Sequence, residues 1–502
     1  MGTHAGNGGM RAAARRCVSN IDGKWPSIKY CSLGFYSAWI LLTMGGAGVG
    51  TGPAGLDTGS ANNLLYLSSG VPLTLVLICC GIAGKRIEPH ISRGPLVPLM
   101  ALLASACTFL IVEEGIALGV ALFIGAAACT GVGTAFLCLR IGHMYSTLDS
   151  RGVFFAAFAS GLFANLLYFM CVAMGQTVAS VLLSLFPLLA FVLALLRPEE
   201  GGAPVEREED IVPASMLPRG FLGRCMLFVF VTTVAVGITR GIVTASNEPG
   251  VVQGQATISV FVTFLVSVVL ITSAAIVNGI SQFDTSKLYH PLIVVVAVVS
   301  LLSPLLGSHY LWLQGIVTTV AYNILTLLLW CLFANIAGRT DIGACRVFGL
   351  GRGSSAFGNT LGQLIATVLS GAVAGMEGYL LGIGIACAIV ILVVAMFVFD
   401  GHTLKDALDK TFREAERLPE AGQVAREDIW DAGCREVAGE RQLTAREREV
   451  LLLVMRGRTA NYISEELGIS YNTTKGHIKN LYAKCGVHSK QELFDLIETK
   501  LP

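Results

Sequence analysis

The chain has 502 residues, of which 54% are hydrophobic and only 14% are charged. Soluble domains carry about 25% charged residues, so this composition argues against a soluble enzyme. The charges are also unevenly placed, because 33 of the 69 Lys, Arg, Asp and Glu residues lie in residues 401–502. We therefore expect a membrane region over the first four-fifths of the chain and an aqueous domain after it. The 14 Cys are scattered without a CxxC pair, which predicts unpaired thiols.

Apolar runs long enough to cross a bilayer come after an N-terminal tail of residues 1–29. A helix needs about 20 apolar residues to span the hydrocarbon core. Twelve runs qualify, at about residues 30–51, 61–84, 95–112, 115–139, 152–174, 177–196, 221–243, 255–280, 290–306, 309–334, 354–375 and 378–399. The sequence therefore predicts a twelve-span membrane domain over residues 30–400.

The basic residues predict the orientation of these spans. Nineteen Lys and Arg precede residue 401, and eighteen of them fall in the tail or in the connections on one side of the spans. The exception is Arg240, near the end of the seventh run, while Asp57 and Glu377 mark the opposite side. Basic residues favour the cytoplasmic side. We therefore expect a multi-pass protein of the inner (cytoplasmic) membrane with both termini in the cytoplasm.

A polar stretch at residues 197–220 divides the spans into halves at residues 30–196 and 221–400. Six plus six spans around a cytoplasmic linker resemble the major facilitator architecture, in which two six-helix halves enclose a central cavity. The resemblance implies a transporter or a ligand-binding relative of one. The loop Gly81-Ile82-Ala83-Gly84-Lys85-Arg86 lacks the acidic residue of that family's signature. This difference argues against transport.

Few ionisable groups lie inside the predicted spans, so the candidate ligand contacts are mostly polar or aromatic. Arg240 is either an interfacial side chain or a contact for an anionic group in an outward cavity. The other candidates are helix-packing residues or pocket residues, and the sequence leaves both possibilities open. They are Tyr36, Trp39, Asn165, Asn323 and Gln363.

Some glycines are spaced four residues apart, as at Gly358 and Gly362, and would therefore lie on the same face of a helix. Such spacing predicts close packing of helix backbones, or alternatively a moving helix. Residues 401–440 have six basic and ten acidic residues, and the pattern from Leu404 to Ala415 suits an amphipathic helix. This juxtamembrane segment is either a passive tether or a relay between the membrane domain and the C-terminal domain.

Residues 441–502 predict four short helices. Thr444 and Glu447 are spaced as a capping box, and Ser470 suits the N-cap of the third helix, which Gly486 would end. A helix, a Gly-containing turn and a helix with a basic face form a helix-turn-helix. Lys475 and Lys479 lie four residues apart and therefore share a face.

The amino-acid sequence of these helices closely resembles that of the LuxR-type DNA-binding domain. The matching runs are Leu443-Thr444-Ala445-Arg446-Glu447-Arg448-Glu449-Val450-Leu451 and Ile469-Ser470-Tyr471-Asn472-Thr473-Thr474-Lys475-Gly476-His477-Ile478-Lys479-Asn480. The resemblance implies a third helix that enters the major groove and a last helix, about 490–499, that pairs subunits. The DNA-binding residues it implies are Tyr471, Asn472, Thr473, Thr474, Lys475, Gly476, His477, Lys479 and Asn480.

Taken together, the sequence predicts an all-α fold: a polytopic membrane helical bundle of about twelve spans followed by a small four-helix LuxR-type domain. The leading hypothesis is a membrane-bound one-component transcriptional regulator. It would sense a small-molecule inducer and bind a two-fold symmetric double-stranded DNA site as a homodimer. The alternative is a major-facilitator-like transporter with an attached DNA-binding regulatory domain. We expect no enzyme activity, no cofactor and no metal site, because the sequence has no phosphate loop, metal-ligand cluster or nucleophile motif.

Overall fold

The structure is a computed structural model of the chain. It describes residues 27–44, 56, 58–113, 119–148, 150–195, 220–246, 249–278, 311–372, 434–455, 463–464, 466–468, 470–487, 492–493 and 496–497. The chain divides into two compact units, Met1–Phe412 and Arg413–Pro502. Each unit is described separately below.

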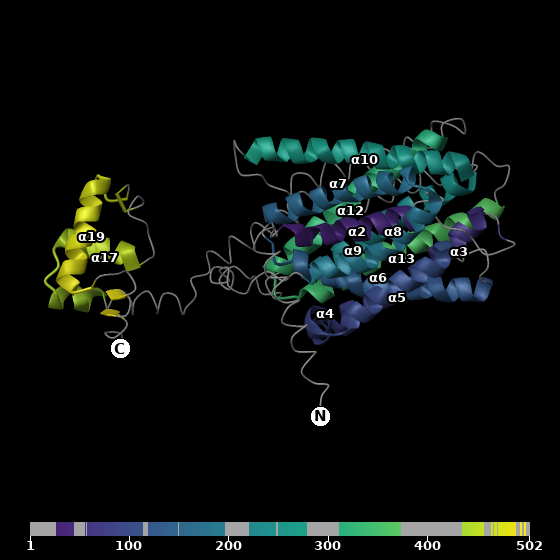
Figure 1. Cartoon of the computed structure of the whole chain (residues 1–502). Helices are drawn as coiled ribbons and strands as arrows, with labels where there is room; N and C mark the ends of the chain where they lie inside the picture. Colours follow the sequence, from purple (N-terminus) through teal and green to yellow (C-terminus); the bar gives the residue numbers. More distant parts are fainter. Residues whose placement is uncertain are drawn as a thin grey trace, which may run out of the picture. The chain divides into compact units, whose positions relative to one another are not determined.

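The first unit is a bundle of long helices that run side by side (Figure 1). After a 3-10 turn, η1 (Ile28–Cys31), its first half contains α2 (Ser32–Met44), α3 (Thr58–Ala83), η2 (Gly84–Arg86), α4 (Glu88–Arg93), α5 (Leu96–Glu113), α6 (Val120–Tyr145), α7 (Ser150–Ala173) and α8 (Gln176–Ala194). The second half contains α9 (Phe221–Ser246), α10 (Pro249–Asn278), α12 (Leu311–Arg339) and α13 (Ala344–Ala372). Ten of the twelve predicted spans coincide with these helices. The ninth and twelfth, at 290–306 and 378–399, lie outside the described residues.

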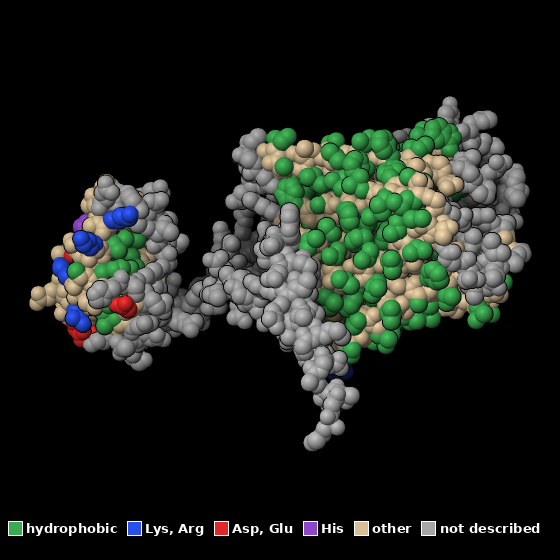
Figure 2. Space-filling model, viewed as in Figure 1, with side chains coloured by type: hydrophobic (Ala, Val, Ile, Leu, Met, Phe, Trp, Pro, Cys, Tyr) green, Lys and Arg blue, Asp and Glu red, His purple; other side chains and the backbone are tan. Residues whose placement is uncertain are grey.

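The composition and surface of this unit are those of a multi-pass membrane protein. Within the described residues, seven helices are long and apolar enough to cross a bilayer. Large apolar side chains cover the face seen in Figure 2. Leu75, Ile82 and Leu122 are 58%, 74% and 66% exposed. Exposing so large an apolar surface to water would be unfavourable, whereas contact with lipid chains is not.

Close helix contacts explain the glycine pairs. Helix α13 packs against α9 and α3, and α3 packs against α6. A Cβ added at Gly358 would lie 2.5 Å from the Phe230 carbonyl oxygen, and one added at Gly362 would overlap the carbonyl of Val234. The backbones of α9 and α13 therefore approach each other where the sequence predicted small-residue packing.

The start of α13 differs from the sequence prediction. The eleventh span was expected from residue 354, with Arg346 and Arg352 in a connection, but α13 begins at Ala344. The mean hydropathy of residues 346–352 is low because the stretch contains two arginines and, between them, two glycines. The structure accommodates the glycines as contacts, since the Cα of Gly349 faces Gly81. Arg352 therefore lies about 12 Å along the helix axis, inside a span predicted to hold almost no charge.

Glu88, the first residue of α4, lies beside the N-terminus of α13. Its Oε1 atom accepts a hydrogen bond from the Ala344 N–H at 3.3 Å and lies 3.3 Å from His143 Nδ1. The His143 imidazole, together with the Ala344 N–H, holds the pKa of Glu88 below its ordinary value. A carboxylate at a helix N-terminus is favourable because of the helix dipole. The loop after α3 thus supplies an acidic side chain two residues beyond Arg86, although the run from Gly81 to Arg86 itself has none.

The second unit has its own apolar core. It contains a helix at 434–440, α17 (Ala445–Met455) and α19 (Tyr471–Cys485). Helical residues at 463–464 and 466, and at 492–493 and 496–497, fall in the second and fourth predicted helices. The buried core comprises Cys434, Val437, Ala438, Leu443, Val450, Leu451, Val454, Ile463, Leu481, Cys485, Leu493 and Ile497. The core therefore includes a helix that the sequence prediction assigned to the linker before residue 441.

Candidate functional site

Local capping signals define α19, the helix predicted to read DNA. The Ser470 side chain accepts a hydrogen bond from the Thr473 N–H at 3.1 Å and so caps the N-terminus. Gly486 ends the helix with φ +71°, a left-handed conformation that glycine adopts without steric cost. Both predicted boundaries are confirmed.

A second set of contacts joins α19 to the start of α17. Glu447 and Thr444 form the predicted capping box, because the Thr444 N–H donates to Glu447 Oε2 at 2.8 Å and the Glu447 N–H donates to Thr444 Oγ1 at 3.3 Å. The same Glu447 oxygen accepts from Lys484 Nζ at 2.7 Å. Lys484 lies in the last turn of α19. The capping box of α17 therefore also anchors the C-terminal end of α19.

The two faces of α19 differ in chemistry. Leu481 and Cys485 are buried, and Ile478 and Tyr482 pack against the core. The opposite face is polar and exposed, and its members are Thr473, Lys475, Gly476, Lys479 and Asn480. His477 is half-buried between the two faces. Figure 2 shows Lys and Arg side chains on the visible face of this unit. An exposed, basic helix face of this kind suits phosphates and base edges.

Thr474 does not belong to that face. It is fully buried, and its hydroxyl donates to the Ser470 carbonyl at 3.2 Å. Helical spacing explains this position, because residues 474, 478, 481 and 485 follow the apolar period of the helix. Thr474 is therefore removed from the candidate DNA contacts and assigned to the core. The side chains of Tyr471 and Asn472 lie outside the described part of the chain.

Gly476 has open space where a side chain would project, since no heavy atom lies within 4 Å of an added Cβ. Glycine in a helix interior costs about 1 kcal/mol relative to alanine. No packing among the described residues of the unit explains this glycine. Its place on the exposed face suits the close approach of another surface to the helix backbone.

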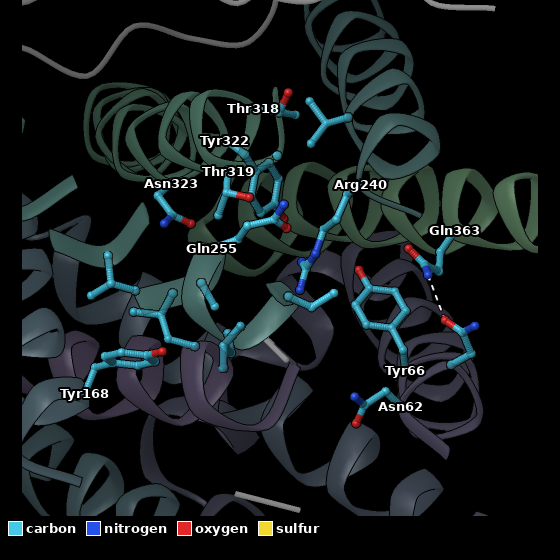
Figure 3. Close-up of a pocket in the computed structure, with 18 residues that line it drawn as sticks. Asn62, Tyr66, Tyr168, Arg240, Gln255, Thr318, Thr319, Tyr322, Asn323 and Gln363 are labelled. Carbon is cyan, nitrogen blue, oxygen red and sulfur yellow. Dashed lines mark hydrogen bonds between the residues drawn. The ribbon is translucent and has the colours of Figure 1, made fainter. Parts of the chain in front are cut away.

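The membrane unit contains a cavity between its two halves. Its larger pocket encloses about 1080 Å³ of empty space, including space open to solvent. Side chains from α2, α3 and α7 line one wall, and side chains from α9, α10, α12 and α13 line the other. In Figure 3, Arg240 points into the space between Tyr66 and Gln255. Its guanidinium carbon lies 5.8 Å from the centre of the Tyr66 ring.

Three of the predicted ligand residues line this larger pocket, namely Arg240, Asn323 and Gln363. Two of them also join helices. Gln363 Nε2 donates to Asn63 Oδ1 at 2.8 Å, and Asn323 Nδ2 donates to Thr263 Oγ1 at 3.4 Å. Packing and cavity lining are therefore not exclusive roles for these amides.

A second pocket, of about 590 Å³ including open space, adjoins the first and shares Ile40, Leu41, Tyr322 and Asn323 with it. It is lined by the predicted residues Tyr36 and Asn165 and by Arg352. Arg352 and Gln363 are eleven residues apart on α13, or about 16 Å along the axis. The two pockets thus adjoin, and each is lined by one arginine, Arg240 in the first and Arg352 in the second.

Trp39 does not line either pocket. It is 3% exposed in a core formed with α5 and α7, and its Nε1 atom donates to Thr108 Oγ1 at 3.1 Å. Trp39 also lines a third, smaller pocket together with Thr43 and Thr108. It therefore packs in the core and lies apart from the two pockets that hold the other predicted ligand residues.

Sequence reasoning missed Arg352, Tyr322 and Gln255 as cavity residues. Arg352 was placed in a connection because a hydropathy window cannot distinguish a buried polar residue from a loop. The sequence around Arg352 does contain a signal for a helix. Glycines at 351, 353 and 358 lie near it, and no proline interrupts the stretch. Such a stretch suits a closely packed helix.

Comparison with known proteins agrees with both units. Residues 441–497 match the family described as bacterial regulatory proteins, luxR family. The transcriptional regulatory protein MctR of Rhizobium johnstonii is 37% identical over 90 residues, which cover 17% of this chain and 42% of MctR. The spore germination protein GerE of Bacillus subtilis is 42% identical over 50 residues, which cover 10% of this chain and 68% of GerE. The chain thus spans less than half the length of MctR.

The membrane unit has a major-facilitator-like fold. The crystal structure of the human organic anion transporter MFSD10 (TETRAN) matches with a TM-score of 0.50 and 14% identity. The match covers 77% of this chain and 99% of the transporter, and at this identity it shows the fold alone. Through its C-terminal domain, the chain belongs to the luxR family of bacterial regulatory proteins.

Proposed function

We propose that this chain is a membrane-bound one-component transcriptional regulator. A small molecule enters the cavity of the membrane unit, and the C-terminal unit binds promoter DNA through α19. The protein resides in the inner (cytoplasmic) membrane with both termini in the cytoplasm. On DNA it forms a homodimer on a two-fold symmetric double-stranded site.

One observation carries the proposal: a single chain joins an exposed basic recognition helix to a multi-pass unit with a polar cavity. Lys475 and Lys479 share the exposed face of α19, whereas the buried face holds the helix in its domain. The cavity lies between the two halves, and its described lining contains two arginines and no Asp or Glu. A ligand held between two halves can favour one arrangement of them over another.

The DNA-binding part is tested with residues 413–502, which contain a complete core of their own. The operator is first selected from a random duplex library, and affinity is then measured by fluorescence anisotropy. Lys475→Ala and Lys479→Ala should each weaken specific binding by about 1–3 kcal/mol if they contact bases. The matched control is Arg446→Ala, which removes an exposed positive charge from α17, where it pairs with Glu449. Wild-type affinity in the Lys475→Ala/Lys479→Ala double variant would contradict the assignment.

The sensing part is tested with the full chain. Transcript profiles of a deletion strain and its complemented parent, compared across candidate small molecules, should reveal target genes and inducer together. The response should disappear in the complemented strain that carries the double lysine variant. A response that survives in that strain would show that the compound acts through another regulator.

The second candidate is a transporter with an attached regulatory domain. Two observations favour it: the major-facilitator-like fold and the carboxylate of Glu88 beside the N-terminus of α13. Uptake of the inducer into cells, measured with wild-type protein and with the double lysine variant, separates the two. A pure sensor produces no uptake above the deletion strain, whereas a transporter keeps its uptake when DNA binding is lost.

A further inference from the structure

The second pocket, which Arg352 lines, contains buried hydrogen-bond donors that no described residue satisfies. They are Arg352 Nη1, Asn165 Nδ2 and Thr326 Oγ1, and all three residues line this pocket. Asn165 is only 3% exposed. Buried polar atoms in folded proteins almost always have a partner, so three in one pocket need an explanation.

Arg352 is the strongest of the three. A charged side chain at membrane depth is costly, and such residues usually face a functional site inside the bundle. The Arg352 guanidinium lies 5.5 Å from the centre of the Trp330 ring, and no salt bridge joins it to a described carboxylate. Arg346, six residues earlier on the same helix, is exposed and lines neither pocket.

The chemistry of these donors selects the ligand. A guanidinium and an amide nitrogen can only donate hydrogen bonds, and a threonine hydroxyl can donate one. The complement is a group with several acceptor oxygens and a negative charge, because the described lining holds no Asp or Glu. A planar carboxylate matches the fork of an arginine. The rest of the lining combines apolar side chains, among them Ile40, Leu41 and Leu327, with polar ones such as Ser37 and Thr263.

We propose that Arg352, Asn165 and Thr326 form an anion subsite that holds the carboxylate of a small organic anion, whose body lies against the apolar side chains of the same pocket. This rests on the proposed function, in which the membrane unit binds a small molecule. It replaces Arg240 as the residue that holds the ligand's charge. Arg240, over the ring of Tyr66, lines the larger pocket and not this one.

The test uses the full chain in lipid nanodiscs and pairs of probes that differ only in charge: benzoate and benzamide, hexanoate and hexanamide, 2-naphthoate and 2-naphthamide. Binding is measured by calorimetry. At least one carboxylate should bind about 10-fold or more tightly than its amide. Arg352→Met should lower the affinity for that carboxylate by about 10- to 100-fold and leave the amide within about twofold. The matched control Arg346→Met should change neither.

Three results would overturn the inference: no carboxylate binds better than its amide; Arg352→Met keeps the preference; or Arg240→Met removes it while Arg352→Met does not. If Arg352→Met fails to fold, Arg352→Lys carries the test. It keeps the charge but loses the two-pronged geometry, so carboxylate affinity should fall while amide affinity stays. Full carboxylate affinity in Arg352→Lys would also overturn the inference.

The outcome is separable from the fate of the proposed function, because the binding assay involves neither DNA nor transcription. A neutral inducer that acts through the membrane unit would contradict the carboxylate assignment but would leave the proposed regulator function standing. Loss of DNA recognition by α19 would sink the regulator and leave the anion subsite intact.

Discussion

The contact between α17 and α19 predicts a pH-dependent stability of the DNA-binding unit. Glu447 is 4% exposed, and its Oε2 atom accepts from Lys484 Nζ at 2.7 Å and from Thr444 N at 2.8 Å. The Lys484 ammonium, followed by the Thr444 N–H, lowers the pKa of Glu447 from 4.5 to about 2. The folded state therefore holds the ionised carboxylate far more strongly than the unfolded chain does.

The shift in pKa sets the size of the effect. One pKa unit corresponds to about 1.4 kcal/mol, so a shift of this size corresponds to at most about 3.4 kcal/mol. The side chain of Lys484 is 39% exposed, and solvent screening reduces that figure. We expect about 1–3 kcal/mol of unfolding free energy from this carboxylate. Because its folded pKa is lowered, the contribution is present above the ordinary pKa near 4.5 and is lost as the pH falls toward 2.

The assay is urea unfolding of residues 413–502, followed by circular dichroism at several pH values between about 7 and about 1.5, a range that spans both pKa values of Glu447. Glu447→Gln should lower the unfolding free energy at neutral pH by about 1–3 kcal/mol and flatten its decline with acid. The control is Glu449→Gln, since the Glu449 side chain is 48% exposed in its pair with Arg446. That control should change the unfolding free energy by less than about 1 kcal/mol.

Lys484→Met completes a double-mutant cycle with Glu447→Gln. If the ion pair carries the effect, Glu447→Gln should cost less in the Lys484→Met background than in the wild type, because the partner is already gone. Equal acid sensitivity in the wild type and Glu447→Gln would refute the reasoning, because another group would then be responsible for the pH dependence.

Two further predictions concern α19 and the membrane topology. Gly476→Ala should raise the unfolding free energy of residues 413–502 by up to about 1 kcal/mol in urea titrations, because an added Cβ meets no heavy atom within 4 Å. The same variant should bind its selected operator more weakly in anisotropy measurements; unchanged affinity would show that DNA does not approach this position closely. Reporter enzymes fused after residue 400 should be active in the cytoplasm, and those fused near Asp57 or Glu377 outside it, because eighteen of nineteen basic residues fall on one side. An external reporter after residue 400 would place DNA out of reach and end the regulator proposal.

The features that the sequence predicted well depend on neighbouring residues. The capping box at Thr444 and Glu447, the Ser470 cap and the Gly486 stop all involve residues within four positions of a helix end. Most of the predicted spans were likewise found as helices, because a run of apolar residues carries its own signal. Contacts between distant residues were not predictable in this way. Lys484 and Glu447 are 37 positions apart.

Burial of polar residues was the main source of error. Arg352 was interpreted as part of a loop, and Thr474 was interpreted as a DNA contact from its place in a motif. In both cases the packing partners in the fold determine the environment of the side chain. Arg352 lines a pocket together with residues of α2, α7 and α12, and Thr474 faces the domain core. For Thr474 the helical period already indicated the buried face. For Arg352 no pattern in the sequence specifies which helices surround it.

The proposed anion subsite also constrains how the two units could be coupled. In the proposed regulator, a ligand changes DNA binding only if it binds two arrangements of the membrane halves with different affinities. A tenfold difference provides about 1.4 kcal/mol, which shifts promoter occupancy if the two arrangements are nearly balanced. Unsatisfied donors at Arg352, Asn165 and Thr326 make an arrangement that encloses them costly without a ligand and favourable with one. The same donors would also serve a transporter, but a transporter must release its ligand on the other side. A sensor needs no release on that side, so tight carboxylate binding without uptake would favour regulation over transport.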